Sequence, residues 1–319
     1  MKFKNIFLSF VFLLLAHGVA AAGGPNPNVK YYGYDWLDFY QPTYNVADAF
    51  YVISTAGFST TNLNVVHTID NLNSSTCANG KCAVSIMAGS GTPGVSPWLD
   101  ICPGAVNNTE CQSMGSWGKI WEIAFNIGKS SNTPAAIYFI DEPFDVPALQ
   151  SNKSYVPYQY ASYVCTLRQA MKAYGMNIPI YTILSYGQSQ NANHVSEIQK
   201  GAPVSACPAT DKSSPDWIGI DNYHWSTTDI WATYNRVAPP SNPSSPKWVL
   251  VPPAAKLDMN DQQLHDQIQL YWDFLNQHPS APVVYVMNWR FDTDVLLNRS
   301  SYPKSVALLS FMANTLTPQ

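Results

Sequence analysis

The chain has 319 residues, of which 12% are charged, and it carries 21 acidic against 17 basic side chains. The net charge of −4 argues against a nucleic-acid partner or an anionic membrane surface, because both attract proteins with an excess of Lys and Arg. The length allows one large domain or two ordinary domains.

The N-terminal segment has the pattern of a secretory signal peptide. Lys2 and Lys4 precede an apolar run over residues 6–15, and small residues follow at 20–22. The run is shorter than the roughly 20 apolar residues of a membrane helix. We therefore expect a signal peptide over residues 1–22, a single mature domain over residues 23–319, and a secreted or periplasmic protein with no membrane partner.

Six cysteines follow the N-terminal segment. An even number of cysteines in an exported protein favours disulfides over metal binding or redox chemistry. Their local clustering favours the pairs Cys77–Cys82, Cys102–Cys111 and Cys165–Cys207.

Short runs of β-branched or aromatic residues alternate with amphipathic segments along the chain, which is typical of a parallel sheet covered by helices. The expected strands span residues 29–34, 61–66, 82–88, 135–140, 178–184, 217–221, 248–252 and 283–288. The clearest helices between and after them span residues 116–129, 158–174, 261–277 and 304–316. Eight strands in a chain of this length predict an α/β fold, a single-domain (β/α)8 TIM barrel.

Active sites of this fold lie at the carboxyl ends of the strands. Polar and aromatic residues occupy those positions here. The candidates for substrate binding are Tyr34, Asp35, Trp36, Asn64, Tyr186, Tyr223, His224, Trp225, Asn288 and Trp289, and the candidates for catalysis are Asp141, Glu142 and Asp221. Carboxylates and aromatic rings at one end of a barrel are what cleavage of a sugar polymer needs, because rings stack on sugar faces and paired carboxylates act as acid and base.

The fourth expected strand ends in Asp141, Glu142 and Pro143. This tripeptide resembles the barrel-fold glycoside hydrolases, in which the fourth strand commonly ends in Asn-Glu-Pro and the Glu is the acid/base. The resemblance implies that Glu142 is the general acid of a secreted glycosidase that acts on a carbohydrate. In the same families the seventh strand supplies a nucleophilic Glu, whereas the seventh strand here ends in Pro252 and Pro253. The usual retaining mechanism with two carboxylates is therefore disfavoured.

Two other mechanisms remain open. The adjacent pair of Asp141 and Glu142 resembles the acidic pair of the hexosaminidases, and the spaced Asp-x-Glu of family 18 chitinases is similar. The resemblance implies that Asp141 would orient the substrate's acetamido group beside Tyr223 and Trp289. Two close carboxylates raise the pKa of one of them, which keeps a proton available near neutral pH. Alternatively, Glu142 is the acid and Asp221 the base of an inverting enzyme.

Structural roles compete with these assignments. A carboxylate at a strand end can cap a helix or pair with Arg290, and the tryptophans can pack at the barrel rim. His67 and His224 match no HxH or HExxH pattern, and no GxSxG elbow is present. We therefore expect a monomeric, cofactor-free glycosidase, with a non-catalytic carbohydrate-binding barrel as the alternative.

Four Asn-x-Ser/Thr sequons, at Asn73, Asn107, Asn152 and Asn298, would be glycosylated in a host that modifies asparagine.

Overall fold

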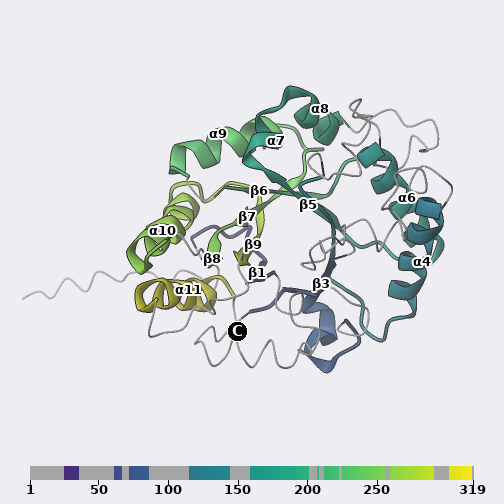
Figure 1. The fold of residues 1–319 in the computed structure, drawn as a ribbon, viewed down its shortest axis with the longest axis horizontal. Helices are drawn as coiled ribbons and strands as arrows, with labels where there is room; N and C mark the ends of the chain where they lie inside the picture. Colours follow the sequence, from purple (N-terminus) through teal and green to yellow (C-terminus); the bar gives the residue numbers. More distant parts are fainter. Residues whose placement is uncertain are drawn as a thin grey trace, which may run out of the picture.

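The strands of the chain form one parallel sheet that curls into a nearly closed barrel (Figure 1). The computed structural model describes residues 25–35, 61–66, 72–85, 115–143, 159–200, 207, 212–222, 225–255, 259–290 and 302–317. The strands are β1 (Tyr31–Tyr34), β2 (Asn64–Val66), β3 (Cys82–Ser85), β4 (Ala136–Asp141), β5 (Ile180–Ser185), β6 (Trp217–Asp221), β7 (Lys247–Val251), β8 (Pro253–Ala255) and β9 (Val283–Arg290). Their order is β1-β9-β7-β6-β5-β4-β3-β2, and the short β8 pairs with β9. The predicted (β/α)8 barrel is confirmed.

Helices surround the sheet (Figure 1). They are η1 (Ser75–Gly80), α4 (Gly115–Lys129), α6 (Gln159–Ala173), α7 (Tyr186–Gln190), α8 (Ala192–Lys200), α9 (Thr227–Val237), α10 (Asp261–Gln277) and α11 (Pro303–Leu316). Each strand and helix range expected from the sequence overlaps one of these elements. None of the helices in the described ranges is long and apolar enough to cross a membrane.

The gap between β1 and β2 is bridged by two asparagine side chains. Asn62 Oδ1 accepts a hydrogen bond from the Tyr32 N–H at 2.8 Å, and Asn64 Oδ1 accepts one from the Tyr34 N–H at 3.0 Å. The Asn62 N–H in turn donates to the Tyr32 carbonyl at 3.0 Å. Buried backbone groups that lack a hydrogen-bond partner cost free energy. The two side-chain amides therefore accept the hydrogen bonds of the β1 N–H groups where regular strand pairing is missing.

The inside of the barrel is filled by side chains. Tyr138 and Tyr181 stack there with ring centroids 4.8 Å apart, and Trp217 lies 5.8 Å from Tyr181. These residues belong to a cluster that consists of strand residues and residues just before strands: Leu63, Val65, Ala83, Ala136, Tyr138, Tyr181, Ile183, Trp217, Val249, Val251, Val284, Tyr285 and Met287. The residues that alternate with them in sequence pack under the helices instead. The interior is thus a packed core rather than a pore, as is usual in this fold.

Tyrosine hydroxyls bind backbone groups of the barrel wall. Tyr234, from α9, accepts a hydrogen bond from the Ile220 N–H at 2.9 Å and donates to the Val249 carbonyl, so it joins β6 to β7. Tyr271, from α10, donates to the Val251 carbonyl at 2.8 Å. Burial raises the pKa of both phenols well above the usual value, which favours the protonated form that donates these bonds.

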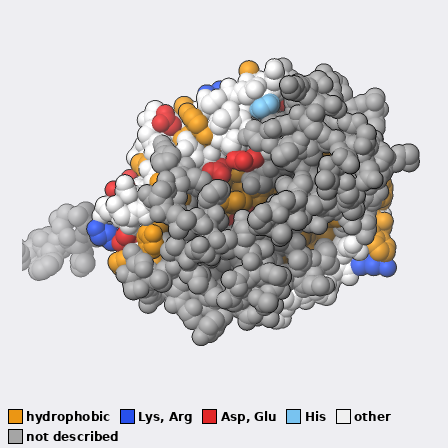
Figure 2. Space-filling model, in the orientation of Figure 1, with side chains coloured by type: hydrophobic (Ala, Val, Ile, Leu, Met, Phe, Trp, Pro, Cys, Tyr) orange, Lys and Arg blue, Asp and Glu red, His pale blue; other side chains and the backbone are white. Residues whose placement is uncertain are grey.

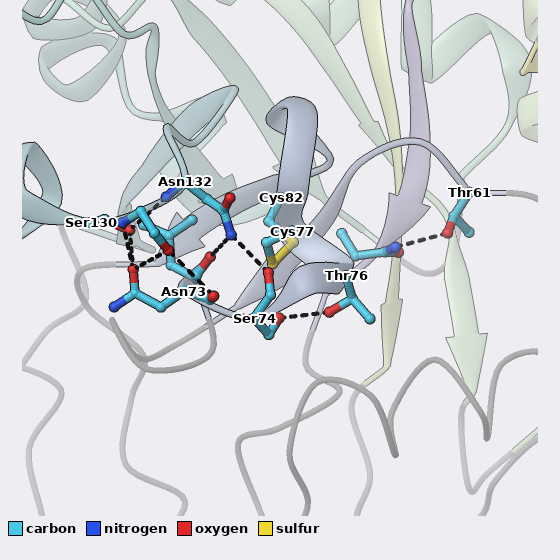
Figure 3. Close-up of a disulfide and its surroundings, with 11 residues drawn as sticks. Thr61, Asn73, Ser74, Thr76, Cys77, Cys82, Ser130 and Asn132 are labelled. Carbon is cyan, nitrogen blue, oxygen red and sulfur yellow. Dashed lines mark hydrogen bonds between the residues drawn. A yellow bond between two sulfur atoms is a disulfide. The ribbon is translucent and has the colours of Figure 1, made fainter.

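Two of the three predicted disulfides are confirmed. Cys77 is bonded to Cys82 across η1 and the start of β3, and Cys165 of α6 is bonded to Cys207; the first of these is drawn in Figure 3. The pair Cys102–Cys111 lies outside the described residues. Both confirmed bonds anchor segments on the outside of the barrel, away from the strand ends that carry the candidate site.

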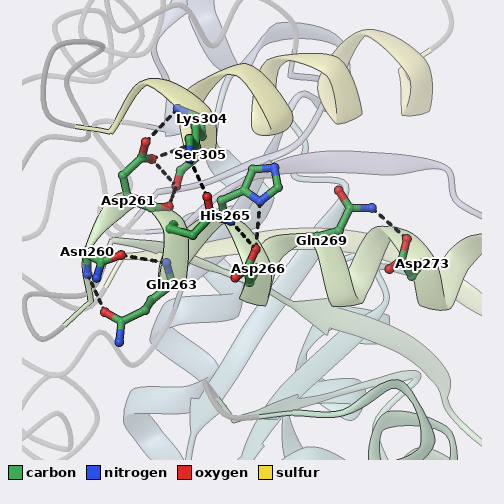
Figure 4. A network of polar contacts seen from close by, with 10 residues as sticks. Asn260, Asp261, Gln263, His265, Asp266, Gln269, Asp273, Lys304 and Ser305 are labelled. Atoms are coloured by element: carbon green, nitrogen blue, oxygen red, sulfur yellow. Dashed lines mark hydrogen bonds and ion pairs between the residues drawn. The ribbon is translucent and has the colours of Figure 1, made fainter.

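The N-terminus of α11 is capped by a side chain from α10 (Figure 4). Asp261 accepts hydrogen bonds from the backbone N–H groups of Lys304 and Ser305, both at 3.0 Å. Tyr302, the residue at the N-cap position of α11, makes no side-chain capping bond of its own. The carboxylate of Asp261 therefore satisfies two free N–H groups of α11 and links the last two helices.

We expect Asp261→Ala to lower the free energy of unfolding at pH 7 by about 1–2 kcal/mol, the usual cost of a lost N-cap. Burial raises the pKa of Asp261, but the hydrogen bonds from Ser305 and Lys304 outweigh it and leave the pKa below its usual 3.8. Because the folded pKa is lower than the unfolded one, this stabilisation is complete above the unfolded pKa and is lost as the pH falls through the folded pKa.

Urea unfolding of the wild type and Asp261→Ala between about pH 3 and pH 7 measures this effect, and the difference between the curves should shrink below about pH 4. Asp273→Asn is the control, since Asp273 accepts a bond only from Gln269 of its own helix among the contacts seen. A difference that stays constant with pH would show that Asp261 acts through packing and not through its charge.

Candidate functional site

Glu142 follows β4 directly and has an unusual backbone conformation. Its φ is 44°, in the left-handed region that costs a residue with a side chain roughly 1–2 kcal/mol, and Pro143 after it restricts the backbone further. The Glu142 N–H donates to the Ile183 carbonyl of β5 at 2.8 Å, and the side chain is half-buried. Conformations of this kind persist only where the surrounding structure enforces them, and they cluster at functional sites.

The register of β4 is irregular just before this point. The pairing with β5 shifts between Tyr138 and Ile140, and Asp141 then lies opposite Ile183. Bulges next to active sites change the direction in which the following side chains point. For Asp141 the structure describes the backbone alone, so its predicted role in catalysis stays a prediction.

Asp221 ends β6, with its side chain half-buried. It is paired with Ser185 of β5, whereas Asp141 is paired with Ile183, so Glu142 and Asp221 lie at nearly the same height on the barrel. Only β5 separates their strands, and two strand spacings amount to about 10 Å between backbones. Two acidic residues therefore lie at the same end of the barrel, at the ends of strands that β5 separates. In the view of Figure 2, acidic and hydrophobic side chains lie next to each other near the middle of the molecule.

An aromatic pair follows β5 and β6. Tyr186 begins α7 directly after β5, and Trp225 follows β6. Their rings meet edge to face with centroids 5.3 Å apart; Tyr186 is 40% exposed, whereas Trp225 is buried. Trp225 therefore supports an exposed ring directly after β5, the strand that pairs with β6.

β7 and β9 continue the barrel wall from β6. The Trp289 N–H of β9 donates to the Pro252 carbonyl at 2.9 Å, and the Trp289 side chain is half-buried beside Pro253 of β8. The described residues 247–255 of this wall contain no carboxylate. The wall therefore supplies an indole, and residues 247–255 supply no carboxylate nucleophile.

Asp35 follows β1 and is fully buried. Its N–H donates to the Asn288 carbonyl of β9 at 3.1 Å. Burial raises the pKa of Tyr285 well above its usual value, and the nearby charge of Asp35 raises it further. Asp35 is thus a buried acid at the carboxyl end of β1, near the Tyr285 ring of β9.

Three predicted binding residues lie in the barrel wall instead. Tyr34, Asn64 and Asn288 are at most 4% exposed, and each takes part in the contacts that hold β1 to its two neighbours. Asn64 Oδ1 accepts from the Tyr34 N–H, and Asn288 donates to the Gly33 carbonyl at 2.9 Å. These contacts give the two asparagines a structural role, and substrate binding by Tyr34, Asn64 and Asn288 stays a prediction. Trp36, Tyr223 and His224 lie outside the described residues.

Gly219, which lies two residues before Asp221 in β6, was not among the predicted site residues. A Cβ atom at this position would be 2.8 Å from a side-chain carbon of Ile183 and 3.2 Å from one of Val251. The missing side chain therefore lets the core residues close up beneath Asp221. An isolated Gly inside a strand is the sequence signal for such close packing. No group of three metal-binding side chains occurs within the part of the chain that the structure describes.

No family model matches the sequence, and no curated protein sequence is similar to it. Solved structures are similar in fold. The exo-beta-1,4-mannosidase Op5Man5 from Opitutaceae bacterium strain TAV5 superposes with a TM-score of 0.58 at 11% identity, over 91% of this chain and 60% of the mannosidase. The virulence factor SghA from Agrobacterium tumefaciens gives a TM-score of 0.55 at 9% identity, over 92% and 98% of the two chains.

A psychrophilic glycoside hydrolase family 10 endo-beta-1,4-xylanase gives a TM-score of 0.52 at 11% identity, over 89% of this chain and 96% of the xylanase. At identities this low, the superpositions establish a shared fold and do not identify the reaction. The chain therefore has the (β/α)8 barrel fold that barrel-type glycoside hydrolases have.

Proposed function

We propose that the protein is an exported, cofactor-free glycoside hydrolase that cleaves O-glycosidic bonds of an oligosaccharide or polysaccharide, with Glu142 as the general acid. The observation that carries the proposal is the position of Glu142, held in a left-handed conformation at the end of β4 and nearly level with Asp221 of β6. Tyr186, directly after β5, and Trp289 of β9 supply aromatic rings that are at least partly exposed and could stack on a sugar.

The geometry favours inversion as the mechanism. Glu142 would give its proton to the oxygen of the leaving group while Asp221 takes a proton from a water molecule. That water would attack the anomeric carbon from the opposite face, so that its oxygen replaces the departing one. Inverting pairs have carboxyl groups about 6.5–9.5 Å apart, and two side chains on strands about 10 Å apart reach that separation.

Substrate assistance is the second route. Asp141 would hold the acetamido group of a 2-acetamido sugar so that the acetamido oxygen attacks the anomeric carbon, while Glu142 again protonates the leaving oxygen. Tyr223 and Trp289 would line the pocket, and Trp36, Tyr186 and His224 would contact further parts of the sugar, while the buried Trp225 would support the ring of Tyr186. The absence of a carboxylate from residues 247–255 supports both routes, since neither uses an enzymatic nucleophile from β7.

The same observation supports a second candidate function, a carbohydrate-binding barrel without activity. Such a protein would keep the aromatic rings of Tyr186 and Trp289 and bind sugars without cleaving them. Glu142 and Asp221 would then serve as hydrogen-bond acceptors for sugar hydroxyls.

Incubation of the purified chain with fragments of chitin, peptidoglycan, β-glucan and mannan separates these candidates. We expect release of reducing ends from at least one fragment, and proton NMR of the first product gives its anomeric configuration. Inverted product supports the pair Glu142 and Asp221, whereas retained product from chitin or peptidoglycan alone supports substrate assistance. Calorimetric binding to a fragment without any cleavage over long incubation would contradict the hydrolase proposal and support the binding function.

A further inference from the structure

The sequon Asn73-Ser74-Ser75 lies within the described residues, immediately before η1. Asn73 and Ser75, the acceptor and the hydroxyl residue of the sequon, are both exposed. An N-glycosylation site needs a surface position. Exposure alone does not identify a glycosylation site, so the orientation of the Asn73 amide also matters.

Hydrogen bonds fix the orientation of the Asn73 amide (Figure 3). Asn73 Oδ1 accepts from the Ser131 N–H at 2.8 Å and from the Ser130 hydroxyl at 2.7 Å. A backbone N–H only donates, so the atom that faces Ser131 must be the oxygen, and the two ends of the amide are not interchangeable here. The nitrogen, Nδ2, consequently points away from the Ser130 and Ser131 turn, as Figure 3 shows, and the hydrogen bonds of Asn73 with described residues use its oxygen atoms.

This arrangement is compatible with a glycan. An oligosaccharyltransferase joins Nδ2 to the anomeric carbon of a sugar carried on a polyprenyl diphosphate. The bond from that carbon to the diphosphate oxygen breaks, the diphosphate leaves, and Nδ2 loses one proton to a base of the transferase. The product still contains the carbonyl Oδ1, so the bonds from Ser130 and Ser131 would remain in the folded glycoprotein.

The position of Asn73 also keeps a glycan away from the candidate site. Asn132, three residues after Lys129 at the end of α4, donates through its side chain to the carbonyls of Leu72 and Ser74 at 2.8 and 2.7 Å. Residues 130–132 lead into β4 from its amino end, whereas Glu142 follows its carboxyl end. A glycan on Asn73 would therefore lie at the opposite end of the barrel from Glu142.

We propose that Asn73 is an N-linked glycosylation site in a host that has this modification. The proposal rests on the exposure and amide orientation of Asn73 in the folded chain and on the expected export of the chain. It does not depend on whether the barrel hydrolyses sugars. The attached glycan would cover the polar surface around the start of η1 and leave access to the carboxyl ends of the strands unchanged.

To test this proposal, the full chain, including residues 1–22, is expressed in a eukaryotic secretory host. Peptides from the secreted and the cell-associated chain are treated with N-glycosidase in water labelled with oxygen-18, and mass spectrometry then identifies asparagines converted to labelled aspartate. We expect the label at Asn73 in the wild type, its loss in Ser75→Ala, and its retention in Ser74→Ala, which keeps the sequon.

Ser75→Ala leaves Asn73 and its contacts with Ser130 and Ser131 in place, so loss of the label in this variant reports the modification and not misfolding. An unlabelled Asn73 peptide from the wild type in both fractions, or a label that persists in Ser75→Ala, would overturn the proposal. Reducing-end release by Ser75→Ala should equal that of the wild type, because residue 75 is remote from Glu142.

Discussion

Glu142→Gln is expected to lower the turnover number at least about a hundredfold, the lower end of the contribution of general acid catalysis. Glutamine has nearly the shape of glutamate and keeps a hydrogen-bonding amide, but it has no acidic proton to give to the leaving oxygen. The backbone of residue 142 already has a φ of 44°, and both side chains meet the same steric cost there, so the fold should tolerate the change.

Initial rates of reducing-end release on the best fragment measure this effect, with thermal unfolding as the check on the fold. Aryl glycosides with good leaving groups add a sharper comparison, because they need little proton donation and should lose much less activity than the natural substrate. Asp273→Asn, on the outer helix α10, is the matched control and should keep full activity. Equal losses on both kinds of substrate would indicate a structural role for Glu142, and full activity in the variant would remove the assignment.

Gly33→Ala is expected to cost at least about 3 kcal/mol of unfolding free energy, at or above the range for overpacked sites. A Cβ atom on residue 33 would lie 1.5 Å from the Leu63 carbonyl oxygen and 2.9 Å from Asn64 Oδ1. The obstacle is backbone, and it is held in place because the Tyr285 hydroxyl donates to the same carbonyl at 2.9 Å. The variant must therefore separate β1 from the segment that leads into β2.

Urea unfolding at pH 7, followed by tryptophan fluorescence, measures this loss. Gly187→Ala is the matched control: its nearest neighbour would be Ser185 Oγ at 3.9 Å, and residue 187 is an exposed position in α7. Alanine favours helix, so this control should be neutral or stabilised by up to about 1 kcal/mol. A Gly33→Ala variant as stable as the wild type would show that β1 and β2 do not approach as closely as described.

The strands of the barrel could be recognised in the sequence because both faces of each are buried, which produces short apolar runs. Segments without that signal were missed. β8 contains Pro253 and two alanines, which are poor strand formers, and it exists because it pairs with Trp289 and Arg290 of β9. The short helix α7 begins immediately after β5, too close to the strand for a separate periodic pattern.

The candidate site was only partly predictable, because the direction of a side chain on a strand changes with every residue. In β9, Met287 belongs to the interior cluster and Trp289 packs against it, whereas Asn288 between them binds the backbone of β1. Register shifts, such as the one between Trp248 and Val249 in the pairing with β9, alter this alternation in ways that no residue pattern reveals. The sequence therefore indicated which strand ends carry polar residues but not which of them project inward.

Closure of the ring also determines when the molecule is able to assemble. β1 is paired with β9, 254 residues later at Tyr31 and Tyr285, and the Tyr32 hydroxyl donates to Leu309 of the last helix. During synthesis the first strand must wait for almost the entire polypeptide before its partner leaves the ribosome. Until then β1 has an unpaired edge, which is prone to aggregation. Chaperones that protect nascent chains, and the pace of translation, are therefore expected to influence the yield of this barrel more than that of a protein built from local contacts.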